Sequence, residues 1–454
     1  MRKVKFLIPL LFIGAMSLTS CNLFDESDLA LHNHFNTPET EEYTPPEGTT
    51  VVEGNIEGKE IEECPETLVF KNIGYAVDNK IKNTYGVGGD NYQGFNVNEG
   101  KDYDATQGTN NYDLYVPNSA SKTGDHMVIL FVHGGAWISG FKTDVNEYVY
   151  EFANKGYITA TIKYTLLKKD IISDATADSA DTNISLSVFR DLDEIDACLK
   201  SIKKVLEELK FDTTKTHLVI GGVSSGSHLS MLYSYSRGHN SPLPISFVVN
   251  AVGPTDIKPY AWKSFKGVDD SVLNSGLDKN AIKDQEDAEN LQPLTLAIEI
   301  DGLYPEWNEY RTLKIANGMC GLPYSNKDIA SLTDGEKKVI TNKTADSYLG
   351  MAGEDGGQDQ MSVTYWMEKN KLTDKYPMVC AYAGQDGVVG IAQYANLQTK
   401  LDARSIAYKY TYFKNCAHDL TDVSTKKIDE TAYAELVSNI DAWCLKTLNH
   451  QTLD

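Results

Sequence analysis

The chain has 454 residues, enough for one large α/β domain with insertions or for two domains. Hydrophobic residues make up 41% of it and charged residues 23%, a globular balance that excludes a wholly disordered or membrane-embedded chain. The formal net charge of −22 at pH 7 would be repelled by phosphate backbones, which excludes nucleic acid as a partner.

The first 20 residues have the pattern of a bacterial export signal. Three basic residues precede an apolar stretch from Phe6 to Met16 that is too short to span a bilayer. Small residues then lead into Cys21, and this pattern resembles the lipobox of bacterial lipoproteins. The resemblance implies that residues 1–20 are removed and that Cys21 carries the lipid, so the protein is exported and held on a membrane, at the periplasmic face or the cell surface. An ordinary secretory signal followed by a chance cysteine is the alternative.

Residues 21–65 differ in composition from the rest of the chain. Acidic residues recur, Pro45-Pro46 interrupts, Lys59 is the single basic residue, and no apolar period is visible. This composition predicts a disordered acidic tether between the lipid and a folded domain over residues 66–454.

Short β-rich runs then alternate with helical patterns. The alternation predicts an α/β fold, a mostly parallel central sheet flanked by helices. The run 127–132 is continuously apolar, as expected of a strand buried on both faces. The amphipathic period of 192–209 and 433–443 predicts helices that pack on the sheet. The predicted strands are 113–117, 127–132, 157–163, 217–220, 245–250, 377–383 and 407–413.

The segment 255–376 interrupts this alternation. It is far longer than one crossover helix requires, so it predicts a lid or cap inserted between two sheet strands. Its many aromatic residues either line an acyl or sugar pocket or form the core of a subdomain, and the sequence leaves both interpretations open.

Six cysteines follow Cys21. They include no CxxC pair, so a zinc site is not expected. An exported location permits disulfides, but six cysteines allow fifteen pairings and the sequence does not choose among them. Cys380 lies within an apolar strand pattern, which predicts a core thiol.

The first motif with chemical content follows the strand at 127–132. It reads His133-Gly134-Gly135-Ala136-Trp137. Consecutive small residues let backbone N–H groups face a developing oxyanion. The backbone N–H groups of Gly135 and Ala136 are the predicted donors.

The second motif, GVSSG, follows the strand at 217–220 and precedes a helical pattern. A serine between a strand and a helix lies on a tight turn, and Gly222 and Gly226 let the backbone pass without a Cβ clash. The turn exposes Ser224 at the carboxyl edge of the sheet, close to helix N-terminal amides. Ser224 is therefore the predicted nucleophile, and the N–H of Ser225 is a third oxyanion donor.

Together, HGGAW and GVSSG resemble the α/β-hydrolase fold, and within it the esterase and lipase group with an HGGG-type oxyanion motif. Within this group, the sequence looks most like the bacterial acetylesterase-like, feruloyl-esterase-like and formamidase-like members. The resemblance covers residues 111–448, apart from the interruption at 255–376. The sequence departs from the family at Ala136, where the third glycine is usual, and at Ser225-Gly226-Ser227, where Ala-Gly-Gly is usual. Neither departure removes a backbone N–H, but the shape of the pocket stays open.

The family order of nucleophile, acid and base implies the other two catalytic residues. Asp386 lies in a loop similar to the family's G-x-D-x-x-V acid loop, directly after the strand at 377–383. His418 follows the strand at 407–413, where the family has its histidine. Alone, each would be read as a residue of a surface turn; three matches in order after three strands favour catalysis. Asp419 is a competing acid, which its neighbour's backbone should turn away from the same imidazole.

Two further histidines lie near these motifs. His133 belongs to the oxyanion loop, where the family resemblance implies that its ring braces the backbone. His228 lies one helical turn beyond Ser224, and its side chain is expected to pack behind the turn.

These residues predict a serine-dependent hydrolase that cleaves carboxylic esters, with short acyl or polysaccharide-linked acyl groups, through an acyl-enzyme on Ser224. No metal or organic cofactor is required. Two alternatives stay open: an amide-cleaving peptidase or formamidase with the same triad, and an anchored binding protein that kept the fold without turnover. The sequence does not determine the acyl group, the alcohol or the oligomeric state.

Overall fold

The computed structural model describes residues 58–75, 111–135, 137, 140–164, 166, 188–256, 361–369, 375–386, 389–390 and 392–454. The predicted signal peptide, the lipidation site Cys21, residues 21–57 of the predicted tether and residues 257–360 of the predicted cap lie outside these ranges. Ala136, predicted as an oxyanion donor, also lies outside them.

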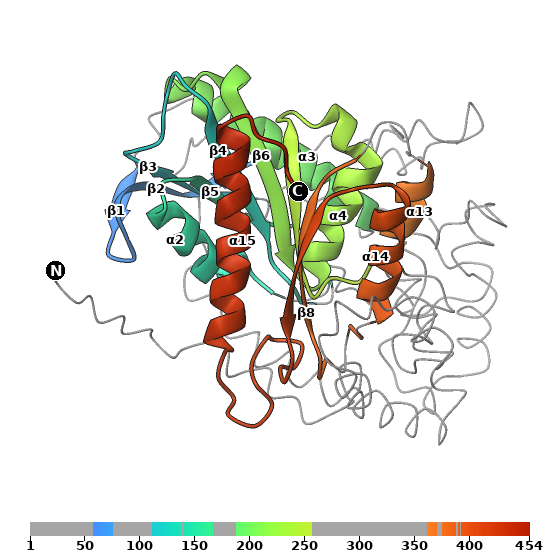
Figure 1. Ribbon diagram of the computed structural model, residues 1–454. Coiled ribbons are helices and arrows are strands. Elements are labelled where there is room, and N and C mark those ends of the chain that lie inside the picture. Colours follow the sequence, from blue (N-terminus) through green and yellow to red (C-terminus); the bar gives the residue numbers. More distant parts are fainter. Residues whose placement is uncertain are drawn as a thin grey trace, which may run out of the picture.

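Within the described ranges, nine strands form one sheet in the order β1-β2-β3-β5-β4-β6-β7-β8-β9 (Figure 1). The pairs β1–β2, β2–β3 and β3–β5 are antiparallel. The pairs β5–β4, β4–β6, β6–β7, β7–β8 and β8–β9 are parallel. This confirms the predicted mostly parallel sheet. The bounds are β1 Lys59–Ile61, β2 Cys64–Gly74, β3 Asn111–Pro117, β4 His126–Val132, β5 Ile158–Lys163, β6 Thr216–Val223, β7 Ile245–Ala251, β8 Met378–Ala383 and β9 Tyr408–Phe413.

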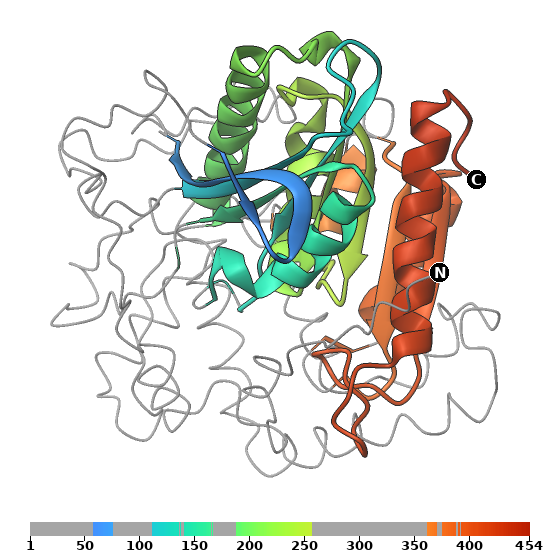
Figure 2. The same cartoon turned by 90° about the vertical axis from the view of Figure 1, so that its left-hand side faces the viewer.

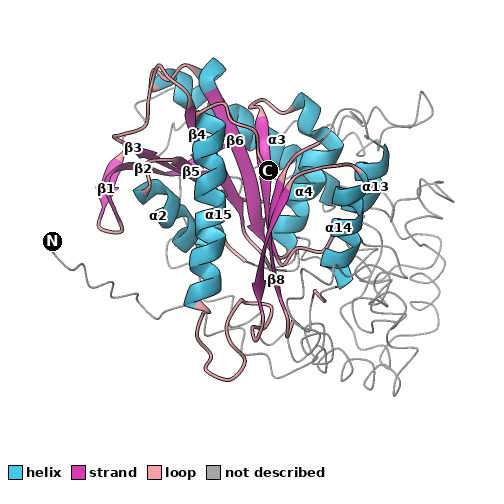
Figure 3. Ribbon diagram, in the orientation of Figure 1, coloured by secondary structure: helices cyan, strands magenta, loops and turns pink. Residues whose placement is uncertain are grey.

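Helices cover both faces of the sheet, because strands β4 to β8 are buried and present apolar side chains to both sides (Figure 3). The first face carries α3 Val188–Glu208, α4 Ser225–Arg237, α13 Val363–Lys369 and α14 Ala392–Ala403. The second face carries α2 Asn146–Asn154 and α15 Glu430–Leu448. Figure 2 shows red α15 on one side of the sheet and green α3 on the other. Short 3₁₀ helices lie at η3 Lys142–Val145, η5 Thr213–Lys215 and η6 Gly238–Asn240.

Each face has its own hydrophobic core. Leu192, Leu199 and Leu206 of α3 belong to the first core, and Leu436, Ile440 and Trp443 of α15 belong to the second. All six side chains are buried, which confirms that these two helices pack on the sheet as their apolar period predicts.

The start of the folded domain differs from the prediction. Residues 59–61 form β1 and residue 64 begins β2, inside the segment 21–65 that was predicted to be a disordered tether. The misassignment has a physical cause: β1 reads KEI at the edge of the sheet with its charged residues exposed, so its composition matches that of a solvated tether. Residues 59–65 therefore belong to the folded domain.

The two ends of the segment 257–360 are held together at the sheet. The backbone N–H of Thr364 donates to the carbonyl of Thr255 at 3.3 Å. Gln393 of α14 accepts hydrogen bonds from the backbone N–H groups of Thr255 and Asp256 at 2.8 and 2.9 Å. The chain therefore leaves the sheet after β7 and returns to α13 at nearly the same place.

The cysteines in the described part of the chain are buried and unpaired: Cys64, Cys198, Cys380, Cys416 and Cys444. Cys380 lies in β8 with its side chain fully buried, as its apolar surroundings predict. In the same part of the chain, none of the helices has the length and apolar character that crossing a bilayer requires.

Candidate active site

The site begins at the turn between β6 and α4. Strand β6 ends at Val223 and α4 begins at Ser225, so Ser224 alone connects them. Its backbone lies in the left-handed region, with φ 55° and ψ −123°, a conformation that costs a non-glycine residue about 1–3 kcal/mol. The backbone N–H of Ser224 donates to the carbonyl of Ala251 at the end of β7 at 2.8 Å, which holds the turn against the sheet.

The two glycines of the motif permit a close approach between backbones. A Cβ at Gly222 would lie 2.4 Å from the carbonyl oxygen of Val132, and a Cβ at Gly226 would lie 2.1 Å from the same oxygen. Real Cβ contacts are never this short, so any side chain here would push α4 away from the end of β4. The predicted need for glycine on both sides of Ser224 therefore has a direct steric cause.

The three predicted catalytic side chains come together at the carboxyl edge of the sheet. His418, in the loop after β9, places Nε2 2.8 Å from Oγ of Ser224. Its Nδ1 lies 2.7 Å from Oδ2 of Asp386, which follows β8. The other carboxylate oxygen of Asp386 accepts from the backbone N–H of Val389 at 2.8 Å, and its side chain is fully buried. A carboxylate can only accept here, so Nδ1 carries the ring proton and Nε2 faces the serine hydroxyl.

The surroundings of His418 favour its protonated form. Burial alone would lower the pKa of His418, but the negative charge of Asp386, the hydrogen bond to it and the charge of Asp419 raise it above the ordinary 6.5. The imidazolium that forms during catalysis is thus stabilised where it arises.

Asp419, the competing acid, faces elsewhere. Its Oδ1 accepts from the backbone N–H of Thr421 at 3.0 Å and from the Thr421 hydroxyl at 2.6 Å. This local turn directs the carboxylate into its own loop, so of the two acids it is Asp386 that bonds the His418 ring, as expected.

The predicted oxyanion loop runs directly over Ser224. A Cβ at Gly134 would lie 3.3 Å from Cβ of Ser224, so the loop backbone is in contact with the nucleophile. Gly135 has φ 114°, which a side chain rarely allows. Ser225 is the first residue of α4, so its N–H has no acceptor within the helix. Gly134 thus contacts Ser224, Gly135 follows it in the same loop, and Ser225 follows Ser224 in the chain, whereas Ala136 lies outside the described residues.

The ring of His133 holds this loop in shape. Its Nδ1 donates to the carbonyl of Gly134 at 2.7 Å, which fixes the peptide plane that also bears the N–H of Gly135. Burial lowers the pKa of His133 to about 4, so the ring is neutral at pH 7. Tyr164, which the sequence did not single out, stacks on His133 at 4.3 Å and donates to its carbonyl at 3.2 Å.

Sequence reasoning also missed the contact that anchors the far end of the loop. The indole Nε1 of Trp137 donates to Nδ1 of His228 at 3.2 Å. His228 packs behind the turn as expected, but it also bonds the carbonyl of Met361 through Nε2 at 2.7 Å. The sequence offered two signals for this contact: a histidine four residues after the nucleophile and a tryptophan at the end of the HGG motif.

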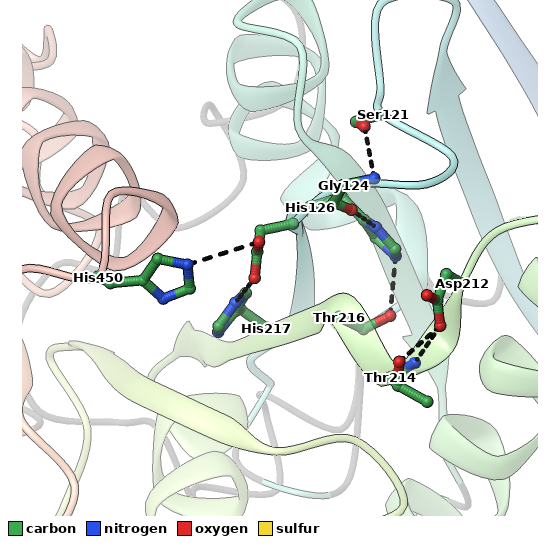
Figure 4. A network of polar contacts seen from close by, with 9 residues as sticks. Ser121, Gly124, His126, Asp212, Thr214, Thr216, His217 and His450 are labelled. Atoms are coloured by element: carbon green, nitrogen blue, oxygen red, sulfur yellow. Dashed lines mark hydrogen bonds and ion pairs between the residues drawn. The ribbon is translucent and has the colours of Figure 1, made fainter.

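The histidines at the opposite edge of the sheet belong to a separate polar network (Figure 4). His126 and His217 lie at the amino ends of β4 and β6, whereas the triad follows the carboxyl ends. His217 pairs with Asp125 at 2.8 Å, and His450 approaches the same carboxylate at 3.6 Å. This network ties the segment after α15 to the sheet and contributes nothing to the triad.

Among the residues that the structure describes, no cluster of three or more His, Cys, Asp or Glu side chains could hold a metal ion. The assembled groups are those of nucleophilic catalysis: an activated hydroxyl, a base, an orienting carboxylate and neighbouring backbone N–H groups.

Fold and site together define the class: the chain has the α/β-hydrolase fold with a Ser–His–Asp arrangement of nucleophilic catalysis. The family model BD-FAE matches residues 112–301, which contain the predicted oxyanion loop and Ser224. This part of the chain is similar in sequence to that family.

Individual relatives are distant. A probable isoprenylcysteine alpha-carbonyl methylesterase from Oryza sativa subsp. japonica is 37% identical over 75 residues, which are 16% of this chain and 18% of that protein. Esterase B from Lactobacillus Rhamnosis superposes with a TM-score of 0.45 at 12% identity, covering 86% of this chain and 90% of the other. A bifunctional GH43-CE protein from Bacteroides eggerthii superposes with a TM-score of 0.44 at 13% identity, covering 85% and 36%.

Proposed function

We propose that the protein hydrolyses carboxylic esters through an acyl-enzyme on Ser224. One observation carries the proposal: a single imidazole, that of His418, bridges the serine hydroxyl at 2.8 Å and a buried carboxylate at 2.7 Å. A hydroxyl is a poor nucleophile until a base takes its proton, and both contacts are within the range that proton transfer requires.

Acylation follows from these contacts. Oγ of Ser224 attacks the ester carbonyl carbon while its proton passes to Nε2 of His418. The C=O π electrons move to the carbonyl oxygen, and the predicted donors of Gly135, Ala136 and Ser225 receive this oxyanion, each worth roughly 3 kcal/mol. The tetrahedral intermediate collapses, the C–O bond to the alcohol breaks, and His418 returns its proton to the leaving oxygen.

Deacylation repeats the sequence with water. His418 takes a proton from a water molecule as its oxygen attacks the acyl carbon, and collapse of the second intermediate breaks the bond to Oγ. The carboxylic acid leaves and Ser224 regains its proton from His418. Throughout, Asp386 keeps the ring in the tautomer that faces Ser224 and stabilises the imidazolium.

We further propose short acyl esters, including acyl groups linked to polysaccharides, as the substrate class. The match of residues 112–301 to BD-FAE and the resemblance of HGGAW and GVSSG to acetyl- and feruloyl-esterase-like proteins support this assignment. Lipid attachment at Cys21 of an exported chain belongs to the same proposal, because an anchored enzyme would meet polymers at the cell envelope.

Replacement of Ser224 tests the reaction. Ser224→Ala should lower hydrolysis of p-nitrophenyl acetate by about 10⁶-fold, and a fluorophosphonate should label wild type at Ser224 but not the variant. Ser234→Ala is the matched control, because this buried serine of α4 bonds the Ser230 carbonyl of its own helix and should leave both readouts unchanged.

The substrate class is tested with wild type on p-nitrophenyl acetate, p-nitrophenyl butyrate, methyl ferulate and a peptide p-nitroanilide. We expect turnover of at least one ester at 100-fold or more the rate on the anilide. Faster cleavage of the anilide would replace the ester assignment by amide hydrolysis, and an unlabelled wild type without turnover would favour a binding protein.

A further inference from the structure

His228 connects three segments that meet at the site. Its backbone N–H donates to the carbonyl of Ser224 at 3.0 Å, one turn earlier in α4. Its ring accepts from Trp137 at the end of the predicted oxyanion loop and donates to Met361, the residue at which the chain returns from 257–360. One residue of the nucleophile's helix therefore contacts the loop above it and the end of the insertion.

The two ring contacts allow a single protonation state. An indole N–H can only donate, so Nδ1 of His228 must present a lone pair to Trp137. A carbonyl can only accept, so Nε2 must carry the hydrogen toward Met361. The ring is therefore neutral, with its proton on Nε2. Burial lowers the pKa of His228 to about 4, which agrees with this state.

The residue that His228 holds is strained. Trp137 has φ 63°, the left-handed region, where an aromatic residue rarely lies without support. Its indole is buried and lies edge-on to the His228 ring at 5.2 Å. The hydrogen bond and this burial offset the strain, so the backbone of the loop depends on the partner that His228 provides.

We propose that His228 is a positioning residue of the hydrolase: its Nδ1 fixes Trp137, and thereby sets the height of the oxyanion loop above Ser224. The inference rests on the proposed function, because it assigns His228 an effect on the oxyanion formed in that reaction. His228 touches neither the substrate nor the reacting atoms. Since its other ring nitrogen holds Met361, the loop is also linked to the end of the segment 257–360.

The expected kinetic signature is specific to the transition state. Misplaced oxyanion donors weaken an interaction that is made fully only when the carbonyl oxygen becomes charged, so kcat falls while KM changes little. A residue that merely stabilised the fold would lower Tm and leave kcat of the folded fraction unchanged.

Two substitutions of His228 separate its two ring contacts. In His228→Asn the amide oxygen can take the place of Nδ1 and accept from Trp137, while the bond to Met361 is lost. In His228→Gln the amide nitrogen can take the place of Nε2 and donate to Met361, while the acceptor for Trp137 is lost. Trp137→Phe removes the indole N–H and keeps an aromatic ring, so it tests the same bond if a His228 variant does not fold.

The experiment compares kcat, KM and the rate constant of fluorophosphonate inactivation for the full chain, at a temperature where each variant is folded by circular dichroism. We expect His228→Gln and Trp137→Phe to lower kcat and the inactivation rate by about 10–100-fold with KM within about twofold. His228→Asn should stay within about threefold of wild type. The double variant Trp137→Phe/His228→Gln should resemble either single variant, because both remove one bond.

Two results would overturn the proposal: a kcat within twofold of wild type for folded His228→Gln or Trp137→Phe, or a rise in KM with unchanged kcat. A loss in His228→Asn as large as in His228→Gln would also contradict the assignment to Nδ1. Failure of the proposed function has a different outcome, since wild type itself would then neither turn over ester nor be labelled at Ser224.

Discussion

The imidazole of His418 must be neutral to accept the proton of Ser224, yet its surroundings favour the cation. Burial opposes the charge, but the charge and hydrogen bond of Asp386, with the charge of Asp419, outweigh it and raise the pKa above 6.5. The same carboxylate that stabilises the imidazolium in the transition state therefore keeps part of the free enzyme protonated near neutral pH.

The raised pKa of His418 determines how the rate depends on pH. Because only neutral His418 acts as the base, kcat/KM for p-nitrophenyl acetate should rise with pH through an apparent pKa above 6.5 and reach a plateau at higher pH. Steady-state rates between pH 5 and 9 measure it. A plateau already complete below pH 6 would contradict the raised pKa.

Substitution of each of the two aspartates near the ring tests which of them is the catalytic acid. Asp386→Asn removes the orienting carboxylate and should lower kcat by about 10⁴-fold. Asp419→Asn should keep most activity and move the rise in kcat/KM to lower pH, because Asp419 contributes charge but no hydrogen bond to the ring. The reverse ranking of the two variants would make Asp419 the catalytic acid.

At the scale of elements, a single hydroxyl, that of Ser227, joins β6, α4 and β7. Oγ of Ser227 donates to the carbonyl of Gly222 at 2.6 Å and accepts from the backbone N–H of Ala251 at 2.8 Å. The side chain is fully buried, so these backbone groups have no access to water in its place. Ser227 thereby holds the first turn of α4 to two strands.

Ser227→Ala should therefore lower the free energy of unfolding by about 1–3 kcal/mol, the cost of leaving a buried backbone group without its partner. Urea denaturation followed by circular dichroism measures it. Ser234→Ala serves as the control, since its hydroxyl bonds a carbonyl of its own helix, and its loss should cost less than about 1 kcal/mol. Equal losses of unfolding free energy in the two variants would mean that the bond between Ser227 and Ala251 of β7 does not stabilise the fold.

For the whole molecule, the sheet brings together residues that are far apart in the sequence. Ser224, Asp386 and His418 each follow a parallel strand, and the carboxyl ends of parallel strands lie at one edge. The described residues on either side of the segment 257–360 meet each other, because Thr364 bonds Thr255, and Met361 bonds His228 in the helix that follows Ser224.

The proposed anchor is a property of the whole protein as well. In a bacterium fed an alkyne-bearing fatty acid, the full chain should incorporate the label, and Cys21→Ser should lose it, because the thiol is the proposed attachment point. Ser20→Ala keeps a small residue before the cysteine and should retain the label. Labelling of Cys21→Ser at the wild-type level would contradict lipidation at this residue.

Short stretches of sequence predicted much of the site. Apolar runs identified the buried strands, because strands covered on both faces have little choice of residue type. GVSSG after such a strand predicted the turn at Ser224, because the spacing of its glycines reflects backbone contacts that no side chain allows. Resemblance to a known family supplied the order of acid and base, which spacing alone does not contain.

Other features depend on contacts between distant segments. Whether Asp386 or Asp419 bonds the His418 ring depends on how the loops orient the two carboxylates. The strand at Lys59–Ile61 forms because it pairs with β2, which its composition does not indicate. The bond from Trp137 to His228 joins residues 91 positions apart, so the sequence shows two residues able to bond but not that they meet.

The sequence by itself thus determined the strands from β3 to β9, the nucleophile turn and the candidate groups, because backbone geometry and burial restrict residue types locally. Only the tertiary structure decided which groups meet, in which tautomer and at what distance, because hydrogen bonds between remote side chains leave no periodic trace along the chain.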